Sequence, residues 1–258
     1  MTIIHPNAIV SKKANIGNDV IISPFAIVED DVEIGNDSYI GPHAVVYNGA
    51  RIGERVKINQ GASIAHTPQD LKFGNEQSYF YIGDDTVIHE FVTLHRGTKE
   101  TGFSSIGKNC LLMAYSHVAH DTTVGDNCIL ANGVQIAGHV TIENWVIIGG
   151  MTPVHQFCIV GQHAMVGGGF RVTQDVPPFI LTAAEPLKFS GLNIIGLRRR
   201  GFSNDDILTL KKTYNYLYDN SLNISQAKKI ITNELGENIF VKQVLEFLER
   251  SKRGLIGK

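Results

Sequence analysis

The segment His117-Val-Ala-His120-Asp121 places two imidazoles and a carboxylate within a few residues of one another. A neutral imidazole, with an ordinary pKa of about 6.5, can take a proton from an alcohol, and a neighbouring carboxylate can orient the ring and stabilise the imidazolium. Neither chain neighbour of His120 is a serine or cysteine that could act as a nucleophile. The segment therefore predicts a histidine general base with an aspartate partner.

A six-residue period surrounds this segment and predicts the elements that position it. Aliphatic residues recur at every sixth position from Ile4 to Ile64, and the same frame continues from Ile82 to Leu94 and from Ile106 to Val172. This period fits neither an α-helix nor an alternating strand, and it is typical of a parallel β-helix in which each hexad forms one short side and a turn. The interruptions near 65–81 and 99–105 keep the frame, so we expect them to be loops inserted between coils.

If three hexads make one coil, residues 18 apart stack on adjacent coils, about 4.8 Å from each other. Stacking then gathers these polar residues on one corner of the prism, close to His117: His120, Asp121, His139, His155 and Gln156. Gly138 falls beside His120, where its backbone N–H can donate to an oxyanion and the missing side chain lets a substrate approach the main chain. The corner therefore favours acyl transfer by a general base, without a covalent enzyme intermediate.

The hexads end at Pro177-Pro178, and the composition changes after them. We expect an irregular connector over 179–202, which carries Arg198-Arg199-Arg200, and then three short helices. The first begins at a capping box of Ser203 and Asp206, and the second ends at Gly236. The predicted organisation is a parallel β-helix over 1–185, with the two loop insertions, and a helical domain over 186–258.

Length, composition and charge are those of a globular chain: 258 residues, 43% hydrophobic, formal net charge −2. This charge balance does not favour a nucleic-acid partner. The N-terminal residues lack the basic and apolar regions of a secretion signal, and no apolar run approaches the roughly 20 residues of a membrane span. We therefore expect no transmembrane segment and a cytoplasmic location.

Several strings carry a family resemblance: His117–Asp121, Ala137-Gly-His-Val140, Ile148–Cys158, Gln174–Pro178, Gln69-Asp-Leu-Lys72, Leu94-His-Arg-Gly-Thr98 and Arg-Arg-Gly-Phe at 199–202. They resemble the acyl-ACP:UDP-N-acetylglucosamine O-acyltransferases of lipid A biosynthesis, which are hexapeptide-repeat acyltransferases. The resemblance implies a left-handed β-helix that transfers a 3-hydroxyacyl group from acyl carrier protein to the 3-OH of UDP-N-acetylglucosamine. This is the first step of lipid A biosynthesis. It implies that His120 is the general base, Asp121 its partner and Gly138 the oxyanion donor.

Other residues match substrate-binding positions of that family: Gln69, Asp70, Lys72, His95, His117, His139, His155, Gln156, Gly168, Asn193, Arg199 and Arg200. The position of Gly168 lies at the end of the acyl groove, where a bulky residue shortens the accepted chain, so glycine suggests a longer acyl group. Ile195 departs from the family, whose members carry an acidic residue near the nucleotide there, and this puts one polar contact in doubt.

The family resemblance also implies that no cofactor or metal is needed, because the acyl donor arrives on the phosphopantetheine of acyl carrier protein. It implies a homotrimer with sites at the subunit interfaces. That arrangement agrees with a functional corner on a prism that encloses no pocket of its own.

Three alternatives remain open from the sequence. His117, His120, His139 and His155 could ligate zinc, as three histidines do in a hexapeptide-repeat carbonic anhydrase. The repeat could serve as a scaffold or binding platform, although such a platform does not explain the polar cluster. The acceptor could be a 3-amino UDP-sugar, which would give an amide. An enzyme that N-acylates the next lipid A intermediate carries an extra N-terminal domain, whereas here the hexads begin at Ile4.

Overall fold

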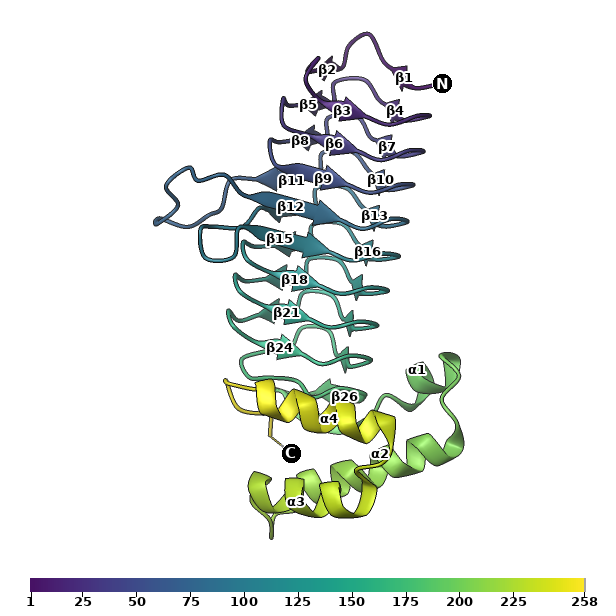
Figure 1. Cartoon of the computed structure of the whole chain (residues 1–258), viewed down its shortest axis with the longest axis vertical. Coiled ribbons are helices and arrows are strands. Elements are labelled where there is room, and N and C mark those ends of the chain that lie inside the picture. The colour runs from purple at the N-terminus through teal and green to yellow at the C-terminus, as the bar shows by residue number, and fades with distance from the viewer. Residues whose placement is uncertain (258) are drawn as a thin grey trace.

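The computed structural model describes residues 1–257 and shows a long prism of stacked coils with helices packed at its C-terminal end (Figure 1). Each complete coil contributes one short strand to each of three sheets, and within the prism every strand pair is parallel. Ile129 pairs with Ile147, which is the predicted offset of 18. The offset grows where an insertion intervenes: Ser63 pairs with Thr93, and Thr93 with His117. The predicted parallel β-helix is confirmed.

The first sheet contains β1 (Ile3–Ile4), β4 (Ile21–Ile22), β7 (Tyr39–Ile40), β10 (Lys57–Ile58), β13 (Val87–Ile88), β16 (Leu111–Leu112), β19 (Ile129–Leu130), β22 (Ile147–Ile148), β25 (Met165–Val166), β26 (Ile180–Ala183) and β27 (Lys188–Leu192). The second contains β2 (Ile9–Val10), β5 (Ile27–Val28), β8 (Val45–Val46), β11 (Ser63–His66), β14 (Thr93–His95), β17 (His117–Val118), β20 (Gln135–Ile136) and β23 (Pro153–Val154). The third contains β3 (Asn15–Ile16), β6 (Glu33–Ile34), β9 (Ala50–Ile52), β12 (Tyr79–Ile82), β15 (Phe103–Ile106), β18 (Thr123–Val124), β21 (Thr141–Ile142) and β24 (Ile159–Val160).

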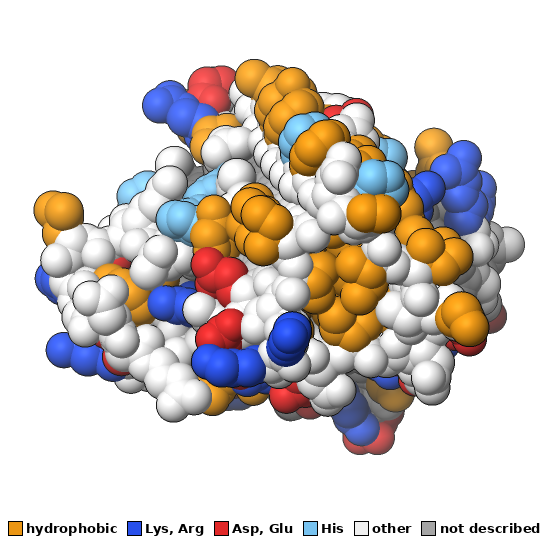
Figure 2. Space-filling model, turned by 90° about the horizontal axis from the view of Figure 1, so that it is seen from above, with side chains coloured by type: hydrophobic (Ala, Val, Ile, Leu, Met, Phe, Trp, Pro, Cys, Tyr) orange, Lys and Arg blue, Asp and Glu red, His pale blue; other side chains and the backbone are white. Residues whose placement is uncertain are grey.

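The core is a column of the aliphatic residues that end the strands. Ile40, Ile58, Ile88 and Leu112 stack in the first sheet and are fully buried. Burying such a side chain stabilises the fold by about 1.5–3 kcal/mol, so a repeated column holds the prism together. In the first coil, by contrast, Ile4 is 46% exposed. Figure 2, which views the N-terminal end, accordingly shows hydrophobic side chains gathered there.

Residues 119–122, 137–140 and 155–158 connect the second sheet to the third and form what we call the histidine corner. Asp121, His139 and Phe157 lie there in the left-handed region, with φ of 56°, 60° and 66°. Equivalent residues at other corners, such as Arg55 and Trp145, have the same conformation. The positive φ is therefore a property of the turn in this fold and does not by itself mark a site.

Both insertions emerge from this same edge of the prism, just before the histidine corner in the stack. Residues 67–78 connect β11 to β12, and residues 96–102 connect β14 to β15. The two loops hold each other: the N–H of Lys99 donates to Oε1 of Glu76 at 2.9 Å, and the guanidinium of Arg96 lies 5.5 Å from the ring centre of Phe73. They form one wall beside the corner (Figure 1).

Residues 179–202 differ from the expected irregular connector. They contain β26, β27 and α1 (Ile194–Arg199). β26 adds to β25 in parallel, and β27 folds back antiparallel, so this hairpin closes the first sheet and covers the last coil. Hexad counting missed it because the hairpin has no six-residue period. The predicted boundary at 185/186 falls in the turn between β26 and β27.

Three further helices follow: α2 (Asn204–Leu217), α3 (Ile224–Leu235) and α4 (Ile239–Arg250). Ser203 and Asp206 form the predicted capping box of α2, and Gly236 caps α3. The hydroxyl of Tyr214, fully buried, donates to the carbonyl of Pro178 and ties α2 to the end of the prism. Within residues 1–257, no helix combines the length and apolar character needed to cross a membrane.

Candidate active site

Asp121 and His120 form a hydrogen-bonded pair at the histidine corner. His120 Nδ1 lies 2.7 Å from Asp121 Oδ2, and the aspartate side chain has no exposed surface. Asp121 also accepts from the N–H of Thr98 at 3.0 Å, from Thr98 Oγ1 at 2.8 Å and from Thr101 Oγ1 at 2.5 Å. Burial raises the pKa of Asp121, but the hydrogen bonds from Thr101, His120 and Thr98 outweigh burial and leave that pKa below its ordinary value.

This pairing sets the tautomer of His120. An ionised carboxylate only accepts hydrogen bonds, so Nδ1 of His120 must carry the proton that it shares with Asp121. In the neutral ring Nε2 is then the free acceptor. The side chain of His120 is 15% exposed, and Nε2 has no hydrogen-bond partner within residues 1–257. The geometry is that of an oriented general base.

Gly138 lies directly against the ring of His120. A Cβ at Gly138 would come within 2.7 Å of His120 Cε1 and 2.8 Å of Nε2, so only glycine leaves the imidazole its place. Within residues 1–257 the N–H of Gly138 has no hydrogen-bond acceptor, whereas its carbonyl accepts from Phe157. A free donor thus lies beside the basic nitrogen, as an oxyanion site requires.

His139 adjoins the pair. Its Nε2 lies 3.9 Å from Asp121 Oδ2, and its ring meets that of His120 edge-on, with 5.1 Å between centres. The other face of His139 stacks on Phe157 at 4.7 Å. His155 and Gln156 lie on the next coil, where both are exposed. The structure thus brings His139 into contact with the pair, while His155 and Gln156 lie further along the corner without touching it.

His117 and His95 continue the site along the outer face of the second sheet. Their ring centres are 5.1 Å apart, and His66 follows 5.6 Å beyond His95. His95 Nδ1 donates to the carbonyl of Thr67 at 2.6 Å, and His117 Nδ1 lies 2.8 Å from the hydroxyl of Thr93. Burial lowers the pKa of His95, and burial with the nearby His95 and His120 lowers that of His117 to about 4. His117 is therefore neutral at physiological pH.

The remaining substrate-binding predictions fall in three places. Gln69 and Lys72 are exposed on the 67–78 loop, where Asp70 Oδ1 accepts from the N–H of Lys72 at 3.0 Å. Gly168 lies on the corner between the first and second sheets, packed on Gly150.

Asn193 caps α1 and Arg199 and Arg200 end it, beside the corner between the third and first sheets. Nη1 of Arg200 lies 3.2 Å from Nδ1 of His163, and its guanidinium stacks on Trp145. Burial lowers the pKa of Arg200. The histidine corner, Gly168 and the arginines thus occupy three different edges of one prism.

Sequence reasoning missed four residues that touch this site: His66, Thr93, Thr98 and Thr101. Thr93 and His66 could have been found by adding the length of each insertion to the 18-residue offset between coils, because the six-residue frame continues across the insertions. Thr98 and Thr101 belong to the 96–102 loop, whose path the period does not describe.

Whether the histidine corner could bind zinc depends on the carboxylate of Asp121. His120, Asp121 and His139 offer ligand atoms within 4.8 Å of one another. However, each oxygen of Asp121 already accepts two hydrogen bonds, from Thr98 and Thr101 on Oδ1 and from Thr98 and His120 on Oδ2. A metal would have to displace those donors, so these residues fit a proton-transfer pair better than a zinc site.

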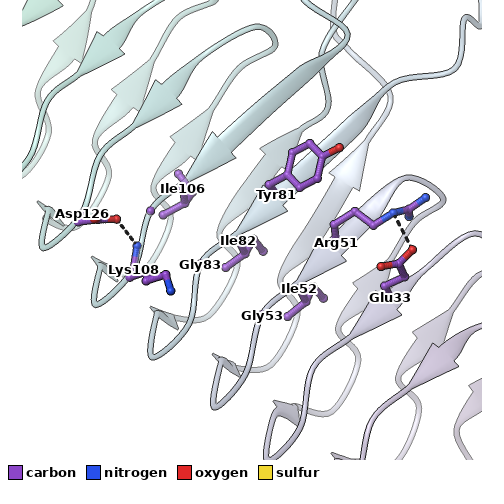
Figure 3. Close-up of a pocket in the computed structure, with 11 residues that line it drawn as sticks. Glu33, Arg51, Ile52, Gly53, Tyr81, Ile82, Gly83, Ile106, Lys108 and Asp126 are labelled. Carbon is purple, nitrogen blue, oxygen red and sulfur yellow. Dashed lines mark hydrogen bonds and ion pairs between the residues drawn. The ribbon is translucent and has the colours of Figure 1, made fainter.

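A hollow of about 700 Å³ lies on the outer face of the third sheet (Figure 3). Arg51 lies 3.2 Å from Glu33, Lys108 pairs with Asp84 at 2.8 Å, and Asp126 accepts from the N–H of Lys108 at 2.7 Å. Ile52, Ile82 and Ile106 lie along its floor, and no histidine lines it. Despite its size, this hollow lacks the histidine base that the histidine corner offers.

Comparisons with known proteins agree along the chain. Residues 175–256 match the family model of UDP-N-acetylglucosamine O-acyltransferase, domain 2, and residues 13–48, 31–66 and 103–138 match the bacterial transferase hexapeptide repeat. The acyl-[acyl-carrier-protein]–UDP-N-acetylglucosamine O-acyltransferase of Burkholderia lata is 50% identical, over 99% of this chain and 100% of its own length.

Solved structures are equally similar. LpxA from Acinetobacter baumannii superposes with a TM-score of 0.96 at 37% identity, covering 98% of this chain and 99% of that one. LpxA from Bacteroides fragilis, a UDP-N-acetylglucosamine acyltransferase, gives 0.95 at 41% identity, covering 98% and 100%. The chain belongs to the family of acyl-[acyl-carrier-protein]–UDP-N-acetylglucosamine O-acyltransferases.

Proposed function

We propose that this protein transfers a 3-hydroxyacyl group from acyl carrier protein to the 3-OH of UDP-N-acetylglucosamine, the first step of lipid A biosynthesis. One observation carries the mechanism: the unpaired Nε2 of His120, oriented by Asp121, lies against Gly138, whose N–H is free. The names of the relatives supply the donor and the acceptor.

The reaction proceeds by direct attack. Nε2 of His120 takes the proton of the sugar hydroxyl as its oxygen bonds to the thioester carbonyl carbon, and the N–H of Gly138 donates to the resulting oxyanion. The carbon–sulfur bond then breaks, and the imidazolium returns its proton to the departing thiolate of the carrier. General-base catalysis contributes about 10²–10⁴-fold and one oxyanion donor about 10²–10³-fold, which together make a covalent enzyme intermediate unnecessary.

The same proposal assigns the binding residues. The acyl donor lies along the wall made by the 67–78 loop, where Gln69, Asp70 and Lys72 are available, and the sugar lies at His117 and His139. Neutral His117 offers hydrogen bonds without a charge. His95, His155 and Gln156 extend this surface on either side. The protein needs no cofactor of its own, because the donor carries the phosphopantetheine.

We infer that the working unit is a homotrimer. Gly168, the acyl-end candidate, and the nucleotide candidates Asn193, Arg199 and Arg200 lie on edges of the prism other than the histidine corner. One chain therefore cannot present all of them to a single substrate. A closed three-fold arrangement can place one edge of each subunit against a different edge of its neighbour, which completes each site from more than one chain.

The test is acyl transfer by the purified protein. 3-Hydroxyacyl carrier proteins of several chain lengths are offered with UDP-N-acetylglucosamine, with the matching 3-amino sugar nucleotide, and with a chelator present. We expect transfer to the 3-hydroxy sugar, undiminished by the chelator, with longer chains preferred because residue 168 is glycine. Transfer to the amino sugar alone would replace the acceptor, and loss of activity to the chelator with bound stoichiometric zinc would replace the mechanism.

A further inference from the structure

The carboxylate of Asp121 is held from the 96–102 loop by two threonines. Thr98 donates twice, through its N–H to Oδ1 at 3.0 Å and through its hydroxyl to Oδ2 at 2.8 Å. The hydroxyl of Thr101 lies 2.5 Å from Oδ1. Together with His120 on Oδ2, these donors surround a side chain that solvent does not reach.

We propose that Thr98 and Thr101 are positioning residues for acyl transfer: they fix the plane of the Asp121 carboxylate and through it the direction of Nε2 of His120. This inference rests on the proposed function, in which His120 is the base. Neither threonine touches the reacting atoms.

The hydroxyl protons of Thr98 and Thr101 are both available to the carboxylate of Asp121. The Thr98 hydroxyl has one proton, and since its oxygen already accepts from the N–H of Glu100 at 3.2 Å, that proton points to Asp121. The Thr101 hydroxyl lies 2.5 Å from Asp121 Oδ1 and 2.8 Å from the carbonyl oxygen of Phe103. A charged acceptor makes the stronger hydrogen bond, so its proton also belongs to the carboxylate.

A water that replaced the Thr98 hydroxyl would have to enter a buried site, because Thr98 and Asp121 are both buried. Removing one partner therefore leaves an oxygen of a buried carboxylate short of a donor, and the carboxylate can rotate away from His120 Nδ1. The loop is itself held, because the N–H of Gly102 donates to the Thr98 carbonyl at 2.8 Å and the N–H of Lys99 donates to Glu76 in the 67–78 loop. The position of Asp121 thus depends on the loop wall as well as on the coil that carries it.

The two threonines also affect the pKa of Asp121. The titratable groups that face Asp121 are His120 and His139, and the other groups in contact with it are the hydroxyls and the N–H of the loop. Hydrogen bonds to the ionised form lower the pKa of Asp121, so their loss raises it. A protonated Asp121 no longer accepts from Nδ1 of His120, so the valine variants should lose this hydrogen bond at a higher pH than the wild type does.

Thr101→Val, Thr98→Val and Thr98→Ser are compared with wild type, and Thr86→Val serves as the matched control. Thr86 is an equally buried threonine whose hydroxyl bonds only backbone groups at another corner, Gly107 and Cys110. Thr101 is exposed on its loop, so Thr101→Val keeps the test valid even where Thr98→Val folds poorly.

We expect each valine variant at 98 or 101 to lower kcat by about 10-fold or more, the size of one hydrogen bond to a charged group, with little change in KM. Thr98→Ser should restore kcat to the wild-type value, while Thr86→Val should leave kcat unchanged. A kcat within twofold of wild type in both Thr101→Val and Thr98→Val would overturn the inference.

The proposed function and this inference fail separately. If the wild type transfers no acyl group, the proposed function fails, and the imidazole nitrogen chemical shifts of His120 are then compared in the same variants. Loss of the Nδ1–H tautomer in the valine variants supports the positioning role, and an unchanged tautomer overturns it.

Discussion

The imidazole of His120 occupies the space that a side chain at residue 138 would fill: a Cβ at Gly138 would lie 2.7 Å from His120 Cε1. The two residues are 18 apart and stack on adjacent coils, where His139 donates its N–H to the carbonyl of His120 at 3.1 Å. Glycine therefore has two roles at this position. It leaves room for the base, and its own N–H, though the residue is buried, has no hydrogen-bond acceptor within residues 1–257.

Gly138→Ala should consequently displace the ring of His120 and lower kcat by about 10²-fold or more, the range found when an oxyanion donor or a general base is lost. Steady-state kinetics measure this. Gly257→Ala is the control, because a Cβ there meets no atom within 4 Å. Wild-type kcat in Gly138→Ala would show that neither the position of the His120 ring nor a close approach of the substrate to Gly138 matters for catalysis.

Activity should be recovered when two inactive variants are combined in one trimer. His120→Ala lacks the proposed base, and Arg199→Ala lacks a proposed nucleotide contact on a different edge of the prism. If each site takes these residues from different chains, random mixing at equal amounts restores about one quarter of the sites. The variants are unfolded and refolded together, and each is refolded alone as the control. If the co-refolded mixture is no more active than the variants refolded separately, the sites are not shared between chains in this way.

Stability should fall as the pH is lowered from about 6.5 toward 4. Burial, with the nearby His95 and His120, holds the pKa of His117 at about 4, and burial with the nearby Arg200 does the same for His163. The unfolded chain binds more protons than the folded one across this window, so each proton taken up favours unfolding. Thermal unfolding against pH measures the slope, and ring-proton NMR of the two histidines measures their titration. A Tm that is flat between these pH values would contradict it.

Asp175 should be a strong contributor to the attachment of the C-terminal segment. Its fully buried carboxylate accepts from the N–H of Ile159, the hydroxyl of Ser251 and the N–H groups of Lys252 and Arg253. Asp175→Ala leaves these donors without their acceptor and should lower the free energy of unfolding by about 3 kcal/mol or more.

Denaturant unfolding checks this prediction. Asp30→Ala, which removes an exposed pair with Lys13, is the control and should have no measurable effect. Equal stability of the two variants would mean that the segment is held by its apolar contacts alone.

The fold was predictable because the period is a property of the packing. Outside the two insertions, an inward aliphatic residue at every sixth position from Ile4 through Val172 allows only a coil of short sides, and the offset between Ile129 and Ile147 follows directly. The contact between Asp121 and His139 follows from the same offset.

The rest of the site depends on segments without that period. Thr98 and Thr101 reach Asp121 through an insertion whose conformation is set by its own hydrogen bonds, and the hairpin β26–β27 follows no hexad. The function was reached through motif resemblance and not through the period, since coils of this kind carry unrelated chemistries.

The most direct test of the account is kcat for acyl transfer to UDP-N-acetylglucosamine by wild type and His120→Ala, with the affinity for the sugar nucleotide measured on both. We expect transfer by the wild type, a loss of two or more decades in kcat of the variant, and nearly unchanged nucleotide affinity. Transfer at the wild-type rate by His120→Ala would contradict the assignment of the base, and with it the reading of the histidine corner as the active site.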